Sequence, residues 1–214
     1  LFLRNKNLTL TIRNIALYFC EMKNISLIFD VETTGLPSKR NPIPYDFDKF
    51  EQARMIEIAY IIVNNDNGKI LKEYSALIKH DTYITVDNSD IHGITTENLL
   101  MEGVPITNVL NDFSKDLETV DTIVAHNLNF DINILLSELY RKYNHHKYCI
   151  GMIYTKSSYC TMLNGQKYLN ESKWPKLTYL YSKIVGKDWT QTHRALDDTK
   201  KCYACYMHLI KSKY

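Results

Sequence analysis

The stretch that decides the fold reads LIFDVETTG and spans residues 27–35. Its apolar residues predict a buried strand, and its last residues predict a turn. Because side chains alternate along a strand, Asp30 and Glu32 point to the same side. Two neighbouring carboxylates are costly to bury, and a divalent cation would remove that cost. The stretch therefore predicts a magnesium or manganese site, the alternative being a strand whose polar end emerges into a turn.

A second segment carries the third acid, Asp131, which follows another short apolar run, residues 122–125. The helix predicted after that run has apolar residues at the spacing of one face, namely Ile132, Leu135, Leu136 and Leu139. Asp131 lies one turn before Leu135, so it shares this inward face. An acid facing the core needs a cation or a hydrogen-bond donor. The alternative is an acid that simply favours the positive end of the helix dipole.

A third segment carries His193 and Asp198, which a helix would separate by about 140°. If they converge, His193 must lie in the loop before the helix. Asp198 shares a helix face with Cys202, Cys205 and Leu209. Asp197 shares a more polar face with Lys201, Ala204 and His208. The pattern therefore predicts Asp198 as the functional acid and Asp197 as the surface acid.

Four acids and a histidine on three segments fit a two-metal phosphodiesterase. In such a site, two ions about 3.5–4 Å apart clamp the attacking and leaving oxygens of an in-line displacement. A histidine beside them can take the proton of the attacking water as general base.

The chain resembles the DEDDh exonucleases of the DnaQ-like group, which includes the proofreading subunit of the bacterial replicative polymerase. Asp30 and Glu32 match that family's first motif, Asp131 the second, and His193 with Asp198 the third. The resemblance runs from about Ser26 to the C-terminus. It implies stepwise 3′→5′ removal of nucleoside monophosphates with two Mg²⁺ or Mn²⁺ ions, and the four acids as metal ligands.

The resemblance also implies substrate contacts. Thr33, Thr34 and Leu36 would contact the terminal nucleotide, and His92 would line its pocket. Asn127 and Phe130 would border the scissile end. Two of these positions have another interpretation: Phe130 as core, and His92-Gly93 as a turn before a helix capped by Thr95.

The order of predicted elements fits a ribonuclease H-like α/β fold, with a mixed central β-sheet flanked by helices. Residues 55–64 and 69–79 predict a hairpin across the turn Asn65-Asp66-Asn67-Gly68. Pro105 is placed to start a helix that runs to Leu117. The run 122–125 predicts a strand parallel to the first, and residues 140–174 predict an irregular stretch rich in tyrosine, lysine and histidine. Its aromatic residues could stack on bases or pack half-buried.

The connection 37–54 is long for neighbouring strands. Long loops in compact domains are usually functional or mobile. We expect it to flank the active site and help choose the substrate, the alternative being a disordered surface insertion.

Composition limits the remaining classes. The 214 residues suit one domain, expected over residues 22–214 and preceded by an N-terminal extension, residues 1–21. That extension carries a charge of +2, and the remainder sums to zero, which argues against broad coating of nucleic acid. Residues 1–20 loosely resemble a mitochondrial presequence, with a translated upstream stretch as the alternative. The five scattered cysteines favour an intracellular, reducing compartment.

The substrate remains open between single-stranded DNA and RNA 3′ ends, with DNA slightly favoured because the motifs read closest to polymerase-associated members. An exoribonuclease or oligoribonuclease is the alternative. A non-catalytic nucleic-acid-binding relative would be expected to lack one of the five residues. A polymerase or a second copy of the chain is a possible partner, although a chain ending at Tyr214 favours a freestanding enzyme over a polymerase accessory subunit. No membrane association is expected, since no run of 18 apolar residues occurs.

Overall fold

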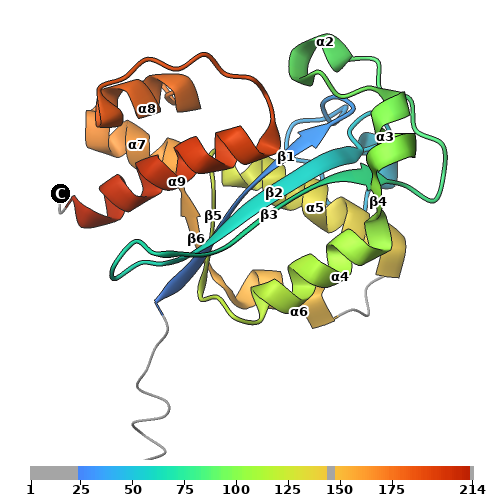
Figure 1. Cartoon of the computed structure of the whole chain (residues 1–214), viewed down its shortest axis with the longest axis horizontal. Helices are drawn as coiled ribbons and strands as arrows, with labels where there is room; N and C mark the ends of the chain where they lie inside the picture. Colours follow the sequence, from blue (N-terminus) through green and yellow to red (C-terminus); the bar gives the residue numbers. More distant parts are fainter. Residues whose placement is uncertain (1–23, 144–147, 213–214) are drawn as a thin grey trace, which may run out of the picture.

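The computed structural model describes residues 24–143 and 148–212. Within them, six strands form one mixed sheet in the order β4-β3-β2-β1-β5-β6. The strands are β1 (Ile25–Thr33), β2 (Met55–Asn64), β3 (Ile70–Lys79), β4 (Val104–Pro105), β5 (Thr122–Ala125) and β6 (Ser157–Cys160). Helices cover both faces of this sheet (Figure 1). The predicted ribonuclease H-like arrangement is therefore confirmed.

Strand β1 lies in the middle of the sheet, antiparallel to β2 and parallel to β5. The parallel pairing of residues 122–125 is thus confirmed. Leu27, Phe29 and Val31 enter one hydrophobic core, whereas Ile28 enters the other. By the same alternation, Asp30 and Glu32 lie on the face that Ile28 occupies.

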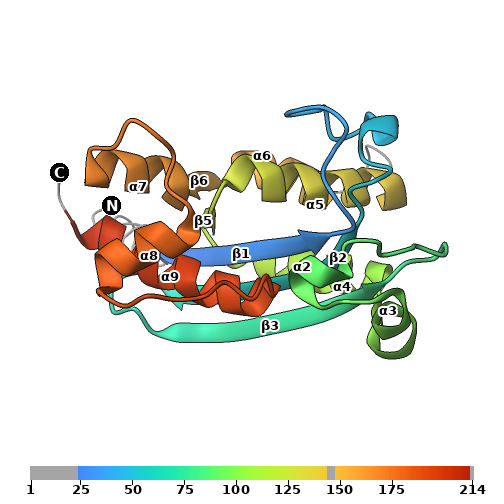
Figure 2. The same cartoon turned by 90° about the horizontal axis from the view of Figure 1, so that it is seen from above.

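The two faces are covered by different helices. On the face of Phe29 lie α4 (Ile106–Leu117), α5 (Leu128–Tyr143) and α6 (Tyr148–Thr155). On the face of Ile28 lie α7 (Thr161–Leu169), α8 (Leu177–Val185) and α9 (Ala195–Lys211). Seen from above, β1 runs between α9 on one side and α5 on the other (Figure 2). Residues on α5 and α9 can therefore meet only around the end of β1.

The hairpin forms as predicted, with β3 beginning at Ile70. Gly68 adopts a φ of +73° in its turn, a conformation that glycine adopts without strain. Between β3 and β5 lie α2 (Ser89–His92) and α3 (Thr96–Glu102). Thr95 caps α3 in a capping box with Asn98, as expected for the start of that helix. Helix α4 begins at Ile106, one position after the predicted start at Pro105, and ends at Leu117 as predicted.

The prediction of an irregular stretch over residues 140–174 was wrong for most of these residues. It contains the end of α5, then α6, β6 and α7. Strand β6 reads SSYC and is half-exposed at the sheet edge, so it lacks the apolar alternation that reveals a strand. Strand β4 was also missed, because two residues carry no periodic pattern.

Two expectations concern other parts of the chain. The predicted N-terminal extension, residues 1–21, lies outside the described residues, as does Met22. Among the described helices, none combines the length and apolar character required for a membrane span.

Candidate active site

The first two acids lie where β1 approaches its end. Asp30 pairs with Ala59 of β2, and Glu32 pairs directly with Glu57. The register then shifts between Glu32 and Thr33. Such irregularities bend a strand and re-aim its side chains, and they are common beside active sites. The sequence therefore places three carboxylates on one face of two neighbouring strands.

Asp131 reaches the same place from the opposite face of the sheet. It lies in the first turn of α5 and is only 2% exposed, so the predicted inward orientation is confirmed. Its carboxylate accepts hydrogen bonds from its own backbone amide and from that of Val31. Its Oδ2 atom is buried and has no hydrogen-bond partner among the described residues. Asp131 therefore approaches the end of β1 with one acceptor still unsatisfied.

His193 and Asp198 come from the third segment. His193 lies in the loop before α9, as expected, in the left-handed conformation with φ +49°. Asp198 lies in the first turn of α9 and is buried on the side of Cys202 and Cys205. Gln191 donates a hydrogen bond to Oδ2 of Asp198, while Oδ1 has no partner within the described residues. The loop conformation lets His193 and Asp198 converge although a regular helix would separate them.

Asp197 has a different environment, and its orientation away from the inner face is confirmed. Its Oδ2 accepts a hydrogen bond from the Trp189 indole at 2.9 Å. Its Oδ1 pairs with Lys201 one helical turn later, at 3.0 Å. Its carboxylate therefore has donors on both oxygens, and it holds the loop before α9 against the helix.

The acids and the histidine form one cluster. Ligand atoms of Glu32, His193 and Asp198 all lie within 4.8 Å of one another. Burial, followed by repulsion from Asp131, Asp198 and Glu32, raises the pKa of Asp30 well above its usual value. The negative groups of all three segments therefore act on one another.

The pKa values of the other three acids show that few positive groups offset the negative charge of the cluster. Burial and the charge of Asp198 raise the pKa of Glu32 to about 8, with Arg194 opposing the shift. Burial raises the pKa of Asp198 to about 6, against the hydrogen bond from Gln191. Burial likewise raises the pKa of Asp131, with the Asp198 charge adding to it. Clustered carboxylates with buried, unpaired oxygens are the donor set that hard divalent cations prefer, so these residues fit such ions.

Glu57 is a site residue that the sequence motifs did not identify. It is 2% exposed, and its Oε1 accepts a hydrogen bond from Nη2 of Arg194 at 2.7 Å. Its Oε2 accepts the Ala195 backbone N–H at 2.9 Å. These bonds attach the residues after His193 to β2. The available signal was a single acid inside an otherwise apolar strand.

Three of the positions expected beside the terminal nucleotide, Thr33, Thr34 and Leu36, lie just after β1 or at its end. Thr33 is buried and donates to the Gly35 carbonyl, while the Thr34 hydroxyl accepts the Arg54 amide, so both hydroxyls stabilise the start of the loop. Leu36 is 73% exposed beside them. Of the three side chains, Leu36 is the most exposed, while Thr34 is half-buried and Thr33 is buried.

His92 lies near the other side of the cluster. It is buried in α2, and its Nδ1 accepts the Ile94 amide, as in the turn interpretation. Its Nε2 has no partner in the described part of the chain. Burial lowers its pKa, the nearby Glu57 charge opposes this shift, and His193 adds to it. His92 therefore combines a local turn contact with a position close to the cluster.

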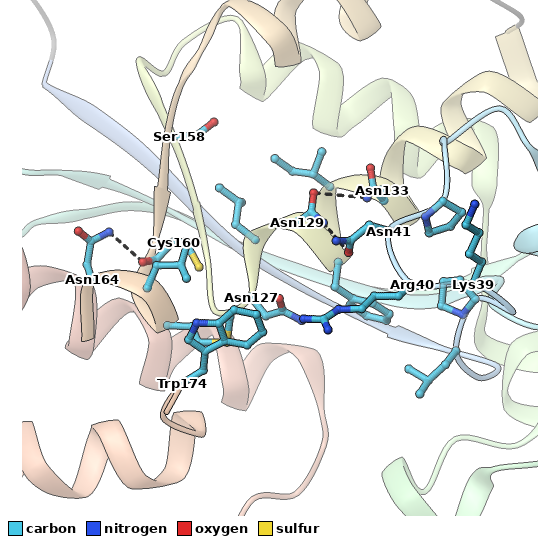
Figure 3. Close-up of a pocket in the computed structure, with 18 of the residues that line it drawn as sticks. Lys39, Arg40, Asn41, Asn127, Asn129, Asn133, Ser158, Cys160, Asn164 and Trp174 are labelled. Carbon is cyan, nitrogen blue, oxygen red and sulfur yellow. Dashed lines mark hydrogen bonds between the residues drawn. The ribbon is translucent and has the colours of Figure 1, made fainter. Parts of the chain in front are cut away.

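Asn127 and Phe130 line a groove of about 880 Å³ next to Asp131. Asn127 adopts φ +69° in the turn before α5, and Phe130 also packs against the core, as in its second interpretation. The substrate contacts of both residues stay predictions. Leu36, Lys39 and Arg40 line the same groove (Figure 3). Residues of the loop 37–54 therefore line a groove beside the segment that carries Asp131, and the part of the loop in substrate choice stays a prediction.

Comparisons with known proteins agree with this geometry. A family model described as Exonuclease (RNase_T) matches residues 27–206. DNA polymerase III subunit epsilon of Treponema pallidum is 36% identical over 111 residues, which are 52% of this chain and 44% of that protein. The PolC-type DNA polymerase III of Thermotoga petrophila is 30% identical over 201 residues, which are 94% of this chain and 13% of that protein. The chain thus spans less than half the length of these two relatives.

A solved structure shares the fold. The nuclease domain of 3'hExo, a DEDDh family member bound to rAMP, superimposes with a TM-score of 0.63 and 14% identity. The match covers 89% of this chain and 94% of that domain. The family model covers most of the chain and includes all three acid-bearing segments. The chain therefore belongs to the RNase_T exonuclease family.

Proposed function

We propose that this chain releases nucleoside monophosphates from single-stranded nucleic acid ends, in the 3′→5′ direction, with two Mg²⁺ or Mn²⁺ ions. The observation that carries the proposal is the uncompensated acid cluster at the end of β1. Asp30, Glu32, Asp131 and Asp198 would hold the ions. Divalent ions supply positive charge that stabilises the developing charge on the attacking and leaving oxygens.

His193 is proposed as the general base that takes a proton from the attacking water. It lies beside Glu32 and Asp198, on a loop rather than on the helix that follows. Glu57 would position it by holding the next two residues through Arg194 and the Ala195 amide. A base must stay within hydrogen-bond reach of the proton it removes, so this attachment limits the motion of the imidazole.

DNA is the slightly favoured substrate. The two curated relatives are named as DNA polymerase III proteins. The alternative is an exoribonuclease or oligoribonuclease, and the domain of 3'hExo was solved with rAMP. A protein distinguishes the two polymers at the 2′-OH, so the residues beside the terminal sugar would decide. Leu36 and His92 are the candidates that flank this position.

Association with a polymerase is a further proposal, suggested by the same relatives, and a homodimer is an alternative arrangement. A function limited to nucleic-acid binding is the weaker candidate. It would not require four acids and a histidine to converge, because binding a phosphate backbone calls for cations instead.

The proposal is tested by incubating the protein with 5′-labelled single-stranded DNA and RNA of one sequence, with magnesium or with chelator. Asp30→Ala serves as the matched inactive variant. A metal-dependent ladder that shortens from the 3′ end, and that is absent with Asp30→Ala, is the expected result. The polymer degraded faster identifies the substrate. Shortening from the 5′ end, or equal turnover by Asp30→Ala, would contradict the proposal.

A further inference from the structure

The groove beside Asp131 continues away from the proposed scissile position. Its lining includes Leu36, Asn127 and Phe130, which are predicted to border that position. The lining then extends over α7, where it includes Met162, Leu163 and Lys167. Neither the four acids nor His193 lines the groove, but Leu36 follows the acids of β1 and Phe130 precedes Asp131 in the chain. A strand bound at the cluster would therefore reach the groove next.

A pair of side chains from distant segments crosses this groove. The Arg40 guanidinium lies over the Trp174 ring, 5.4 Å from its centroid. Figure 3 shows Arg40 extending from its loop toward Trp174, with Asn127 between the two segments. Trp174 is 54% exposed, so its ring remains accessible to a ligand. We call these two residues the Arg40–Trp174 bridge.

Both ends of the Arg40–Trp174 bridge are attached to the segment that carries Asp131. On the loop side, Asn129 donates a hydrogen bond to Asn41 at 2.8 Å. On the other side, a ring nitrogen of His126 lies 3.1 Å from the Pro175 carbonyl, next to Trp174. Burial lowers the pKa of His126 to about 4, so this contact is made by a neutral imidazole. The bridge is therefore positioned by residues at the catalytic end of β5.

The chemistry of the lining suits a nucleic acid strand. Among the described residues that line the groove, Lys39, Arg40 and Lys167 are basic and none is acidic. Apolar side chains and asparagine amides make up most of the remainder. Proteins that bind single strands combine cations along the backbone with aromatic rings on which bases stack. This groove has both features, and its charge is opposite to that of the neighbouring acid cluster.

We infer that the groove holds the nucleotides immediately 5′ of the scissile bond, with one base stacked on Trp174 and a phosphate contacting Arg40. This inference rests on the proposed function and extends it from the terminal nucleotide to the rest of the strand. A base must be unpaired to present its face to the indole ring, so the bridge selects single-stranded ends. The loop 37–54 then contributes to substrate choice through Arg40.

The test compares two substrates of the same site. The p-nitrophenyl ester of thymidine 5′-monophosphate contains only the scissile position, whereas a single-stranded DNA oligomer also fills the groove. Base stacking contributes about 1–3 kcal/mol per base, so Trp174→Ala should lower kcat/KM for the oligomer on the order of tenfold relative to the ester. Most of that loss should appear in KM. Trp174→Phe, which keeps a stacking ring, should restore most of it.

A matched control exists on α8. Lys183 lies over the exposed ring of Tyr179 at 5.3 Å, which gives the same kind of pair outside the groove. Tyr179→Ala should leave the ratio of oligomer to ester activity at the wild-type value. An unchanged ratio in Trp174→Ala, or an equal loss on both substrates, would overturn the inference.

Failure of the proposed function gives a different result. If the wild-type protein hydrolyses neither substrate, binding of a fluorescently labelled oligomer in chelator still tests the groove. Weaker binding by Trp174→Ala and Arg40→Ala, relative to Tyr179→Ala, would support the inference. Equal binding by all three variants would overturn it.

Discussion

Buried carboxylates lie on both faces of the sheet, and they are compensated very differently. Glu138 of α5 is 1% exposed and accepts two hydrogen bonds from Arg54, at 2.8 and 2.9 Å. The Met55 amide adds a third bond at 3.2 Å. On the opposite face, Asp30 and Glu32 lie among other acids, and their pKa values rise. Residues of the chain itself neutralise the charge of Glu138. Asp30 and Glu32 instead require positive charge from a bound ligand.

This difference separates a structural role from a functional one. A bidentate arginine partner already satisfies a buried carboxylate, so that carboxylate requires no bound ligand. Acids that raise one another's pKa and leave buried oxygens unpaired are candidates for metal binding and catalysis. Glu57 belongs between the two, because Arg194 compensates it while both residues border the acid cluster.

Asp198→Ala should abolish hydrolysis while the protein stays folded, because it removes a proposed metal ligand and relieves repulsion. Asp197→Ala is the matched control from the neighbouring position. It should lose only the contacts with Trp189 and Lys201 and keep most of the activity. Rates on a labelled oligonucleotide and circular dichroism spectra measure both effects. Equal losses in the two variants would mean that the helix-face argument for Asp198 is wrong.

His193→Ala should lower kcat by about 10²–10⁴-fold, the usual cost of losing a general base. Its affinity for magnesium, measured by calorimetry, should change little. A large loss of metal affinity would instead make His193 a ligand, since its ring lies within 4.8 Å of the Glu32 and Asp198 oxygens.

Glu138→Ala should lower the free energy of unfolding by about 3–5 kcal/mol, because it leaves the Arg54 charge buried without its partner. Glu51→Ala is the matched control. Glu51 pairs with Arg141 but its side chain is 62% exposed, so its loss should cost less than about 1 kcal/mol. Urea unfolding in chelator measures both. Equal losses of unfolding free energy in the two variants would mean that burial does not make the Glu138 ion pair more important than the exposed one.

The acid cluster should also make the metal-free protein less stable as pH rises. The folded protein keeps a proton on Glu32 up to a pKa of about 8, whereas the unfolded chain loses it near 4.5. Between these values the folded state binds more protons, so stability falls with increasing pH. Magnesium should oppose this loss, raising Tm more at pH 8 than at pH 5, because ion binding requires the ionised carboxylates. A metal-induced shift that is independent of pH would contradict this account.

The sequence predicted those parts of the fold that depend on local pattern. The hairpin follows from the turn residues Asn65 to Gly68 between two strand-like runs, and the start of α3 follows from the Thr95 cap. The inward orientation of Asp131 and Asp198 follows from helix periodicity alone. Strand β6 and the helices around it were not predictable in this way, since SSYC has no periodic pattern and pairs with β5 at an edge.

The same division applies to the site. The four acids and His193 were predictable as candidate site residues, because each occurs in a short motif whose spacing controls which way its side chain points. Only the tertiary structure revealed the partnership of Glu57 with Arg194, which are separated by 137 residues, and the Arg40–Trp174 bridge. Contacts of this kind depend on how packed elements place distant segments, and side-chain alternation within one strand or helix carries no information about that placement.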